Sequence, residues 1–334
     1  MESGAAIGQM MALTIDDLFA SPDHYLHSFE GDAALFVPMD RAAYQRSIFL
    51  DRRIEPAAER SMPVPVGALL PHVPAPKPTG WIFHVAHCGS TLLARALDHL
   101  SGNLVLREPL ALRQLALAPD ARRLKLVAAM LSKRYAADLP TLVKANVPVN
   151  FLLPGVVALD TQARAIFLHC NLRDYVRAIL RSDNHRTWLR NVTAQLVPYL
   201  SDLSALPDAE RIAALWLAQM QAFADAIERL PNARALEAEA FFAEPRRYVA
   251  LAAAHLGVPI DDATLDATIA GPLFSTYSKN PELPFDNEAR VARLAEVERG
   301  LAPEMAQAER WIDARRDEAE RATGVIASAA LGKA

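Results

Sequence analysis

The sequence predicts an α/β protein in which a central parallel sheet is flanked by helices, with an N-terminal cap and a mostly helical C-terminal part. Between residues 81 and 169, short apolar runs alternate with longer stretches of helical periodicity. This alternation is typical of βαβ units around a parallel sheet. From about residue 174 onward the pattern is mostly helical, interrupted by one short apolar segment at 233–236. The sheet is therefore expected in the middle of the chain.

The first 60 residues are expected to form a cap. A helix is predicted from Thr14 to Ala20, and an extended segment follows at 34–38. Residues 61–80 contain six prolines, which fix φ and remove backbone donors, so this stretch is expected to be an extended connector. These features divide the chain into a cap (1–60), a proline-rich connector (61–80) and a main domain (81–330).

The main domain is expected to begin with a buried strand and to end in a charged amphipathic helix or pair of helices. In chain order, the expected elements are a strand at 81–86, a helix that starts after Gly89, a strand at 104–106, a helical stretch through Arg134, strands at 142–143 and 165–169, helices from about 174, a proline-rich loop at 271–287 and the C-terminal helical tail at 288–323.

Composition limits the kinds of partner that are plausible. The chain has 334 residues, 52% hydrophobic and 22% charged, which is enough to bury a full core and excludes disorder for most of it. Its 35 basic and 39 acidic residues give a net charge of −4, so no polycationic surface for nucleic acid or anionic lipid is expected. Any anion must be held by a local site.

Cysteine usage and hydropathy favour a soluble, cytoplasmic protein. Cys88 and Cys170 are the only cysteines, too few for a disulfide framework and without metal-ligand spacing, so no metal is expected. No apolar run reaches the roughly 18 residues that a membrane helix needs, and the start of the sequence lacks a signal-peptide pattern. The oligomeric state has no signature in the sequence.

A glycine loop leads from the first strand of the main domain directly into a helix, in the segment WIFHVAHCGSTLLARAL. Helix N-termini present unpaired N–H groups and partial positive charge, and Gly89 would let the backbone approach an anion closely. Ser90 and Thr91 could add hydroxyl donors. No lysine stands between Gly89 and Ser90, as the Walker pattern requires, which disfavours ordinary ATP or GTP hydrolysis. A helix start capped by Ser or Thr, with no ligand, is the alternative.

The loop resembles the 5′-phosphosulfate loop of sulfotransferases that use 3′-phosphoadenosine 5′-phosphosulfate (PAPS). In that family a cation and a small residue precede Gly-[Ser/Thr]-Thr-Leu. The resemblance implies a P-loop nucleoside-triphosphate-hydrolase-like fold with PAPS as the donor and no metal. The cation is here His87, which is charged only when it is protonated. The resemblance assigns donor binding to the residues Cys88, Gly89, Ser90, Thr91 and Leu92.

Cys88 has two interpretations. A cysteine at a helix N-terminus can have a lowered pKa, which makes a thiolate nucleophile conceivable. The family pattern, however, needs only a small side chain at this place. We favour the interpretation that Cys88 is there for its size.

Glu108 stands between the apolar run LVL and Pro109. A residue before proline avoids the helical region, so Glu108 is expected to be extended at the carboxyl end of a strand, where ligands of open α/β sheets bind. In the tyrosylprotein branch of the sulfotransferases, a glutamate similarly placed after the loop is the general base. The resemblance gives Glu108 this role. A solvated surface glutamate is the alternative.

Lys144 follows another short apolar run, at a second expected strand end. Only six of the 35 basic residues are lysines, so arginine is the usual cation of this chain. A lysine at this position favours a role for a compact point charge. It resembles the sulfotransferase lysine that neutralises the sulfuryl group and the bridging oxygen. The alternative is a surface lysine on a strand-to-helix loop.

The site for the nucleotide 3′-phosphate can be matched in two ways, because the family uses an arginine at a strand end and a serine about two helical turns later. In one alignment these residues are Arg173 and Ser182. In the other, which matches more of the segment NLRD, they fall on Cys170 and Ala178, and both ligands are lost. The resemblance further implies that Lys279, in the proline-rich loop, closes over the nucleotide.

The functional expectation is a sulfotransferase that moves the sulfuryl group of PAPS to a hydroxyl or amine of a small-molecule or peptide acceptor. Glu108, Lys144 and His87 would be the catalytic residues. A catalytically silent protein that binds a nucleotide or a partner at the same place is an alternative, because His87 replaces the usual cation and the 3′-phosphate ligands are uncertain. A P-loop small-molecule kinase is the third alternative, which the missing Walker lysine disfavours.

Overall fold

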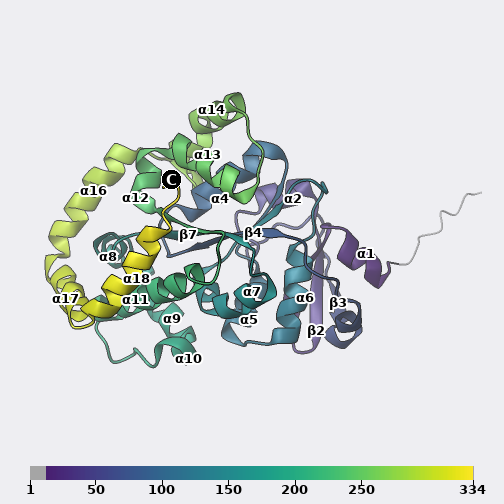
Figure 1. The fold of residues 1–334 in the computed structure, drawn as a ribbon, viewed down its shortest axis with the longest axis horizontal. Coiled ribbons are helices and arrows are strands. Elements are labelled where there is room, and N and C mark those ends of the chain that lie inside the picture. The colour runs from purple at the N-terminus through teal and green to yellow at the C-terminus, as the bar shows by residue number, and fades with distance from the viewer. Residues whose placement is uncertain (1–12, 334) are drawn as a thin grey trace, which may run out of the picture.

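A computed structural model describes residues 13–333 of the chain (Figure 1). Its centre is a five-stranded, all-parallel sheet with the strand order β5-β6-β4-β7-β8. The strands are β4 (Thr79–His84), β5 (Leu104–Arg107), β6 (Thr141–Lys144), β7 (Arg164–His169) and β8 (Ala233–Glu237). The predicted fold class, an α/β protein with a central parallel sheet flanked by helices, is confirmed.

The strand order reverses at β4. Its neighbours are β6 on one side and β7 on the other, so the chain builds the sheet outward in both directions from this strand. In Figure 1, α4 lies on one face of the sheet and α7 on the other. Ligands of open α/β sheets bind outside the carboxyl ends of the strands at such a reversal, and the glycine loop follows β4 at that end.

Helices cover both faces of the sheet. The helices and the one 3₁₀ segment of this part are α4 (Ser90–Ser101), α5 (Leu110–Leu117), α6 (Ala121–Leu131), η2 (Val147–Leu152), α7 (Leu153–Leu159), α8 (Leu172–Leu180), α9 (Asp183–Gln195), α10 (Val197–Leu200), α11 (Asp208–Ile227), α12 (Ala238–Ala243), α13 (Pro245–Leu256), α14 (Asp262–Ala270) and α15 (Pro272–Ser275). A short hairpin, β9 (Thr276–Tyr277) and β10 (Asn280–Pro284), follows them and carries Lys279 in its turn.

Aromatic side chains fill the core between the central strands and α11. The rings of Trp81 and Phe83 stack with centroids 5.6 Å apart, and Phe83 stacks on Phe167 at 5.3 Å. Phe167 contacts Phe223 of α11 at 5.0 Å. Burial of such side chains is the main favourable contribution to folding. It fixes the positions of β4 and β7, and the glycine loop follows β4.

The cap is an antiparallel sheet with the strand order β1-β2-β3. Its elements are α1 (Ile15–Ala20), β1 (His24–Glu30), β2 (Ala33–Pro38), α2 (Arg41–Arg46), β3 (Met62–Pro65), α3 (Val66–Leu69) and the 3₁₀ turn η1 (Leu70–His72). The helix predicted from Thr14 to Ala20 is present as α1, and Thr14 and Asp17 form a capping box that starts it.

The proline-rich stretch is only partly the extended connector that the sequence predicts. Residues 62–65 add a third strand to the cap, which their prolines permit because β3 is an edge strand. Residues 66–72 then form short helical turns. The domain boundaries at 60 and 80 stay predictions, and residues 1–12 of the cap lie outside the described residues.

Both edges of the central sheet are covered by distant parts of the chain. At β5, the backbone N–H of Leu50 donates to the Arg107 carbonyl at 2.7 Å. At β8, the N–H of Ala235 donates to the Ala329 carbonyl at 2.8 Å, and the N–H of Leu331 donates back to the Ala235 carbonyl at 2.7 Å. These contacts satisfy backbone groups that an open edge would leave unpaired.

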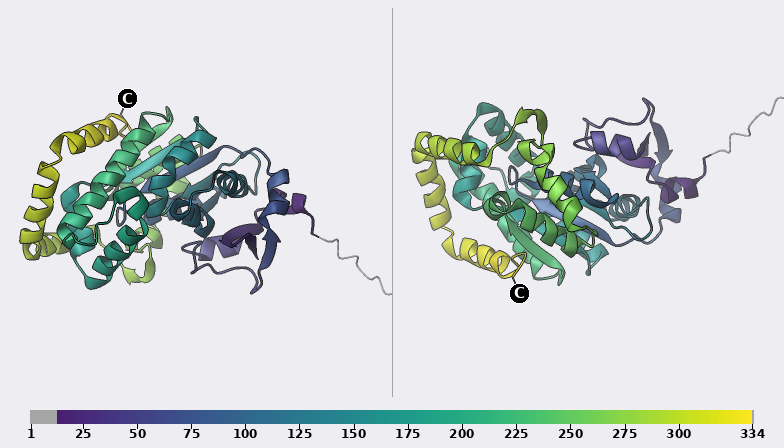
Figure 2. Two further views of the ribbon diagram at one scale, coloured as in Figure 1. Left: turned by 90° about the horizontal axis from the view of Figure 1, so that it is seen from below. Right: turned by 90° about the horizontal axis from the view of Figure 1, so that it is seen from above.

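The C-terminal tail forms three helices, not the one or two that the sequence predicts. They are α16 (Asn287–Gly300), α17 (Ala302–Asp313) and α18 (Arg316–Ser328). Pro303 in the first turn of α17 explains the first break, because proline starts a helix well but does not continue one. The three helices form an arc at the opposite end of the molecule from the cap (Figures 1 and 2). Across residues 13–333, no helix has the length and hydropathy to cross a membrane.

Candidate active site

Three neighbouring strands bring the predicted catalytic residues to one edge of the sheet. β6 ends at Lys144, which pairs in register with Arg107 of β5 and with Ile82 of β4. Glu108 follows β5 directly, and the glycine loop follows β4. The structure therefore places Glu108, Lys144 and the loop together, although 36 residues separate Glu108 from Lys144 along the chain.

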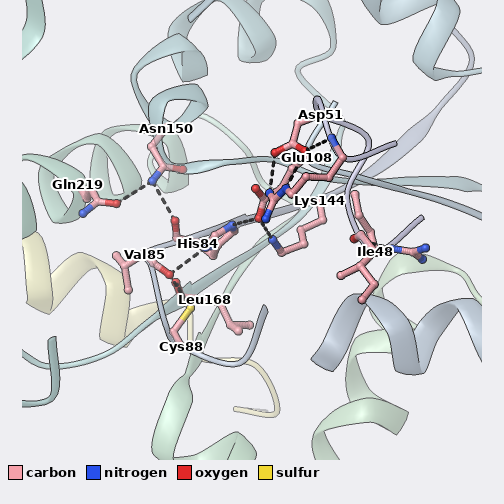
Figure 3. Close-up of polar contacts among 12 residues, drawn as sticks. Ile48, Asp51, His84, Val85, Cys88, Glu108, Lys144, Asn150, Leu168 and Gln219 are labelled. Atoms are coloured by element: carbon pink, nitrogen blue, oxygen red, sulfur yellow. Dashed lines mark hydrogen bonds and ion pairs between the residues drawn. The ribbon is translucent and has the colours of Figure 1, made fainter. Parts of the chain in front are cut away.

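Glu108 and Lys144 form a buried ion pair (Figure 3). The Lys144 ammonium is fully buried and donates to Glu108 Oε1, whose side chain is 16% exposed. The backbone N–H of Glu108 also donates to the Lys144 carbonyl at 2.7 Å. Burial by itself raises the pKa of Glu108, but the charge and hydrogen bond of Lys144, together with His84 and Lys279, outweigh it and lower the pKa to about 2. Glu108 is consequently ionised at neutral pH and bound to its counter-charge.

Two residues of the site have left-handed backbone conformations that only glycine adopts without strain. They are His87, with a φ of 61°, and Glu108, with a φ of 56°. The expectation that Glu108 is extended is wrong, because its φ lies in the left-handed region. The next helix, α5, has Pro109 as its N-cap. Non-glycine residues in this region are held there by their surroundings and cluster at functional sites.

The glycine loop has the features of an anion cradle. Gly89 is the N-cap of α4 with a φ of 84°, and Ser90 and Thr91 are buried in the first turn. The Thr91 hydroxyl is buried without a hydrogen-bond partner among the residues that the structure describes. A buried hydroxyl normally has a partner, so a ligand oxygen at this helix N-terminus would satisfy Thr91 as well as the free N–H groups.

Replacing Gly89 by alanine is expected to damage both the loop and its ligand binding. A Cβ would lie 3.0 Å from Phe242 Cζ and 3.2 Å from Phe241 Cδ1, at a φ that L-residues avoid. We expect a loss of about 1–2 kcal/mol in the free energy of unfolding, and loss of any stabilisation by anionic nucleotides. Thermal melts with and without nucleotide measure both effects. Gly67→Ala, where a Cβ meets nothing within 4 Å, is the matched control.

Cys88 is a buried thiol and not an activated nucleophile. Its Sγ donates to the Val85 carbonyl oxygen at 2.8 Å, and burial raises its pKa to about 11. The interpretation that Cys88 is there for its size fits this environment. The only other cysteine, Cys170, is buried as well, and burial raises its pKa too.

Neither cysteine is therefore expected to react quickly with iodoacetamide in the native protein at neutral pH, because the thiolate is the reactive form. Mass spectrometry should find both thiols unmodified in the folded protein and both modified after denaturation. Rapid labelling of Cys88 under native conditions would contradict the environment described above.

His87 packs against the start of α9. Its ring contacts the rings of His185, with centroids 4.4 Å apart, and Trp188, at 6.2 Å. Burial, together with the charges of Lys279 and His185, lowers the pKa of His87 well below its usual value. His87 is thus neutral where the family has a permanent cation, and Lys279 of the β9–β10 turn brings a positive charge to the loop.

The two residues of the first 3′-phosphate alignment lie in different surroundings. Ser182 is the N-cap of α9, and its hydroxyl lies 3.0 Å from His185 Nδ1, on the His87 side. Arg173 instead donates to Glu309 at 2.6 Å and to Glu298, so it ties α8 to the C-terminal arc. Within the described part of the chain, the structure brings Ser182 toward the loop and leaves Arg173 paired elsewhere.

The residues of the second alignment lie around the start of α8. Asn171 is the N-cap of α8, and its side chain accepts from the backbone N–H of Asp174. Cys170 stands between the end of β7 and this cap, and Ala178 lies within α8. Both alignments of the 3′-phosphate site stay predictions.

A segment of the cap forms part of the site that sequence reasoning missed. The ring of Phe49 faces Lys144 Nζ at 5.6 Å and the guanidinium of Arg53 at 3.9 Å. Arg53 donates to both carboxylate oxygens of Asp51, at 2.9 and 2.6 Å. No motif marks these residues, because their position depends on how the cap packs against β5. Among residues 13–333, no group of three His, Cys, Asp or Glu side chains could hold a metal.

Comparison with known proteins gives likeness in fold only. No protein-family model and no curated protein sequence matches the chain. A sulfotransferase domain from the curacin biosynthetic pathway is similar to 63% of this chain, over 84% of its own length, with 13% identity and a TM-score of 0.40. A sulfotransferase from Alicyclobacillus acidocaldarius is similar to 71% of this chain, over 96% of its own length, with 12% identity and a TM-score of 0.37. Likeness at this level carries no argument about function, which has to come from the site.

Proposed function

We propose that this protein transfers the sulfuryl group of PAPS to a hydroxyl or amine of a small-molecule or peptide acceptor. The observation that supports this most is the combination of an anion loop lacking a Walker lysine with the Glu108–Lys144 pair beside it. Transfer of a sulfuryl group, like that of a phosphoryl group, needs positioning and neutralisation of charge more than covalent catalysis. One base and one buried cation at a helix N-terminus meet those needs.

Each residue has a role in this proposal. The N–H groups at the start of α4 and the Thr91 hydroxyl hold the donor's 5′-phosphosulfate, and Lys144 neutralises the bridging oxygen as it leaves. Glu108 accepts the proton of the acceptor. His87, which is neutral without ligand, forms a hydrogen bond with the donor. The negative charge of the bound donor raises the pKa of His87 and so favours its protonated form.

The ion pair makes Glu108 a weak base until the donor arrives. The bound phosphosulfate of the donor competes with Glu108 for the Lys144 ammonium. Once Lys144 turns to the donor, its lowering effect is lost while burial still acts in the opposite direction, so the pKa of Glu108 rises. Glu108 would then gain its basicity only in the presence of donor.

A catalytically silent nucleotide- or partner-binding protein is the second candidate. It is favoured by the surroundings of Arg173, whose guanidinium is held by two glutamates. The alignment that puts Cys170 and Ala178 in place of the family's 3′-phosphate ligands would have the same consequence. In a catalytically silent protein, the loop would bind the 5′ side of a nucleotide without supporting transfer of a sulfuryl group.

Thermal melts with different nucleotides test these candidates. A ligand at one hundred times its dissociation constant stabilises a protein by about 2.7 kcal/mol. For a sulfotransferase we expect 3′,5′-ADP to raise Tm more than ATP with Mg²⁺, and PAPS to be consumed when an acceptor is supplied. Stabilisation by 3′,5′-ADP without transfer would favour the silent protein, and a larger shift with ATP and Mg²⁺ would favour a kinase. No shift with any nucleotide would overturn the proposal.

A further inference from the structure

His84 is a buried histidine, and one of its ring nitrogens has no hydrogen-bond partner among the residues that the structure describes. It ends β4, is 5% exposed, and its Nδ1 lies 2.8 Å from the Val85 carbonyl oxygen. A carbonyl oxygen can only accept, so Nδ1 carries the proton and Nε2 presents a lone pair. Nε2 is buried without a partner among residues 13–333, and it lies 4.0 Å from Glu108 Oε1 (Figure 3). Buried polar atoms of this kind normally have partners.

The backbone at His84 is held in place from behind. The Asn150 side-chain amide donates to the His84 carbonyl oxygen at 3.0 Å and to Gln219 Oε1, also at 3.0 Å (Figure 3). Gln219 in turn donates to the Tyr175 hydroxyl at 3.2 Å. Together with the Val85 contact, this network fixes the strand end from which the imidazole projects toward Glu108.

His84 is neutral at physiological pH. Burial, followed by the charge of Lys144, lowers its pKa to about 3. A neutral ring cannot form an ion pair with Glu108, so the 4.0 Å approach joins two hydrogen-bond acceptors, one charged and one neutral. Glu108 Oε1 accepts from the Lys144 ammonium, whereas His84 Nε2 has no donor among residues 13–333.

The spacing of the two acceptors defines what fits between them. An atom about 2.9 Å from both, an ordinary hydrogen-bond length, would see them at an angle of about 90°. The two hydrogens on an amine nitrogen are separated by a somewhat wider, near-tetrahedral angle, and slightly bent hydrogen bonds accommodate the difference. A primary amine can therefore donate one N–H to Glu108 and the other to His84, whereas a hydroxyl has only one hydrogen to give.

We propose that His84 and Glu108 together select a primary amine as the acceptor of the sulfuryl group. The inference rests on the proposed sulfuryl transfer. With both N–H groups bound, the amine's lone pair is left for attack on the donor. A hydroxyl in the same place would leave the His84 lone pair unsatisfied, and sites built to accept a hydrogen bond discriminate strongly against ligands that cannot donate it.

The reaction balances with the residues present and PAPS as donor. The amine lone pair forms the N–S bond, and the S–O bond to the bridging oxygen breaks, so that its electron pair leaves on 3′,5′-ADP beside Lys144. The proton that the amine shares with Glu108 passes to the carboxylate. The N–H that faces His84 stays on the sulfamate product. His84 thus takes no proton and acts as an acceptor of a hydrogen bond.

Matched acceptors that differ only in the nucleophile test the inference. Benzylamine is compared with benzyl alcohol, and hexylamine with hexanol, at a pH near the pKa of the amine, with release of 3′,5′-ADP from PAPS as the readout. We expect kcat/KM to be at least about tenfold higher for each amine. Equal or higher values for the alcohols would overturn the inference.

Two variants separate selection from a structural role. His84→Leu removes the acceptor atom and is expected to bring the amine-to-alcohol ratio close to one. His84→Gln restores an acceptor oxygen and is expected to keep the preference for amines. A merely structural role would lower both activities alike and leave the ratio unchanged, which would also overturn the inference. If His84→Leu fails to fold, the wild-type ratio and His84→Gln decide.

A binding readout distinguishes this inference from the proposed function. Melting temperatures are measured with each amine and alcohol, with and without 3′,5′-ADP. If no acceptor is sulfated, yet the amines stabilise the wild type more than the alcohols and His84→Leu abolishes the difference, sulfuryl transfer fails and the amine site stands. If the amines show no advantage in either melts or turnover, the amine site fails whatever the nucleotide results.

Discussion

Replacing Glu108 by glutamine is expected to lower sulfuryl transfer by about 10²–10⁴, the usual effect of losing a general base. Glutamine keeps the shape of the side chain but accepts no proton at neutral pH. Because the donor loop is separate from Glu108, binding of 3′,5′-ADP should be retained. Turnover of PAPS and nucleotide-dependent melts of the same preparation measure the two effects. Full activity of Glu108→Gln would refute the assignment of the base.

The same variant also reports on the ion pair with the fully buried Lys144. The glutamine oxygen can still accept from the ammonium, so we expect a moderate loss of about 1–3 kcal/mol in the free energy of unfolding at neutral pH. Glu228→Gln removes a charge from an exposed pair on the far end of α11 and is the control, with an expected change within about 0.5 kcal/mol.

The stability difference should depend on pH in a defined direction. The pKa of Glu108 is about 2 in the folded protein, against an ordinary value of 4.5. A lowered carboxyl pKa stabilises the folded state fully above the unfolded value, and this contribution is lost as the pH falls toward the folded value. The difference in stability between wild type and Glu108→Gln is therefore expected to shrink between about pH 4.5 and pH 2. A difference that grows in this range would contradict the ion-pair geometry.

Replacing Arg107 by alanine is expected to produce the largest loss of stability, about 3–5 kcal/mol, because it removes one partner of a buried charge pair. Arg107 is 1% exposed and donates to Asp98 at 2.6 Å. It also donates to the carbonyl oxygens of Tyr44 at 2.6 Å and Ser47 at 2.7 Å. These bonds join β5 to the cap segment that carries Phe49 and Arg53.

The loss should reach the active site as well as the fold. Arg107 precedes Glu108, and without its guanidinium the segment 44–50 loses its side-chain bonds at Tyr44 and Ser47 and keeps the backbone bond from Leu50 to residue 107. We expect faster amide hydrogen exchange across 44–50 in Arg107→Ala, in addition to the lower denaturation midpoint. Arg122→Ala, at an exposed position of α6, is the control and should change stability by no more than about 0.5 kcal/mol.

If Arg107→Ala does not fold, Arg107→Lys replaces it. A lysine keeps the charge but offers a single ammonium in place of a planar fork, so it can satisfy only part of the Arg107 bonds. We expect intermediate stability and intermediate exchange. Unchanged stability in either variant would show that the cap does not depend on this arginine.

The sequence by itself determined the class of the fold and the strand ends that matter. Alternating apolar and helical patterns located four strands of the sheet near their observed bounds, and the fifth apolar segment became β8. These patterns are reliable because they express burial of local segments, which depends on nearby residues. They also placed Gly89, Glu108 and Lys144 at carboxyl ends of parallel strands, which a sheet brings to a common edge.

Only the tertiary structure decided how the site works. It set the pairing of Glu108 with Lys144, the neutrality of His87, and the engagement of Arg173 by glutamates from the C-terminal arc. It also brought the segment around Phe49 to Lys144, and it placed His84 Nε2 near Glu108 with no hydrogen-bond partner within the described part of the chain. Charge states and hydrogen-bond partners depend on burial and on groups distant in the sequence, so no local pattern can report them. The chemistry of the site is therefore specified by long-range packing, which includes the bonds of Arg107 that join the cap to the sheet.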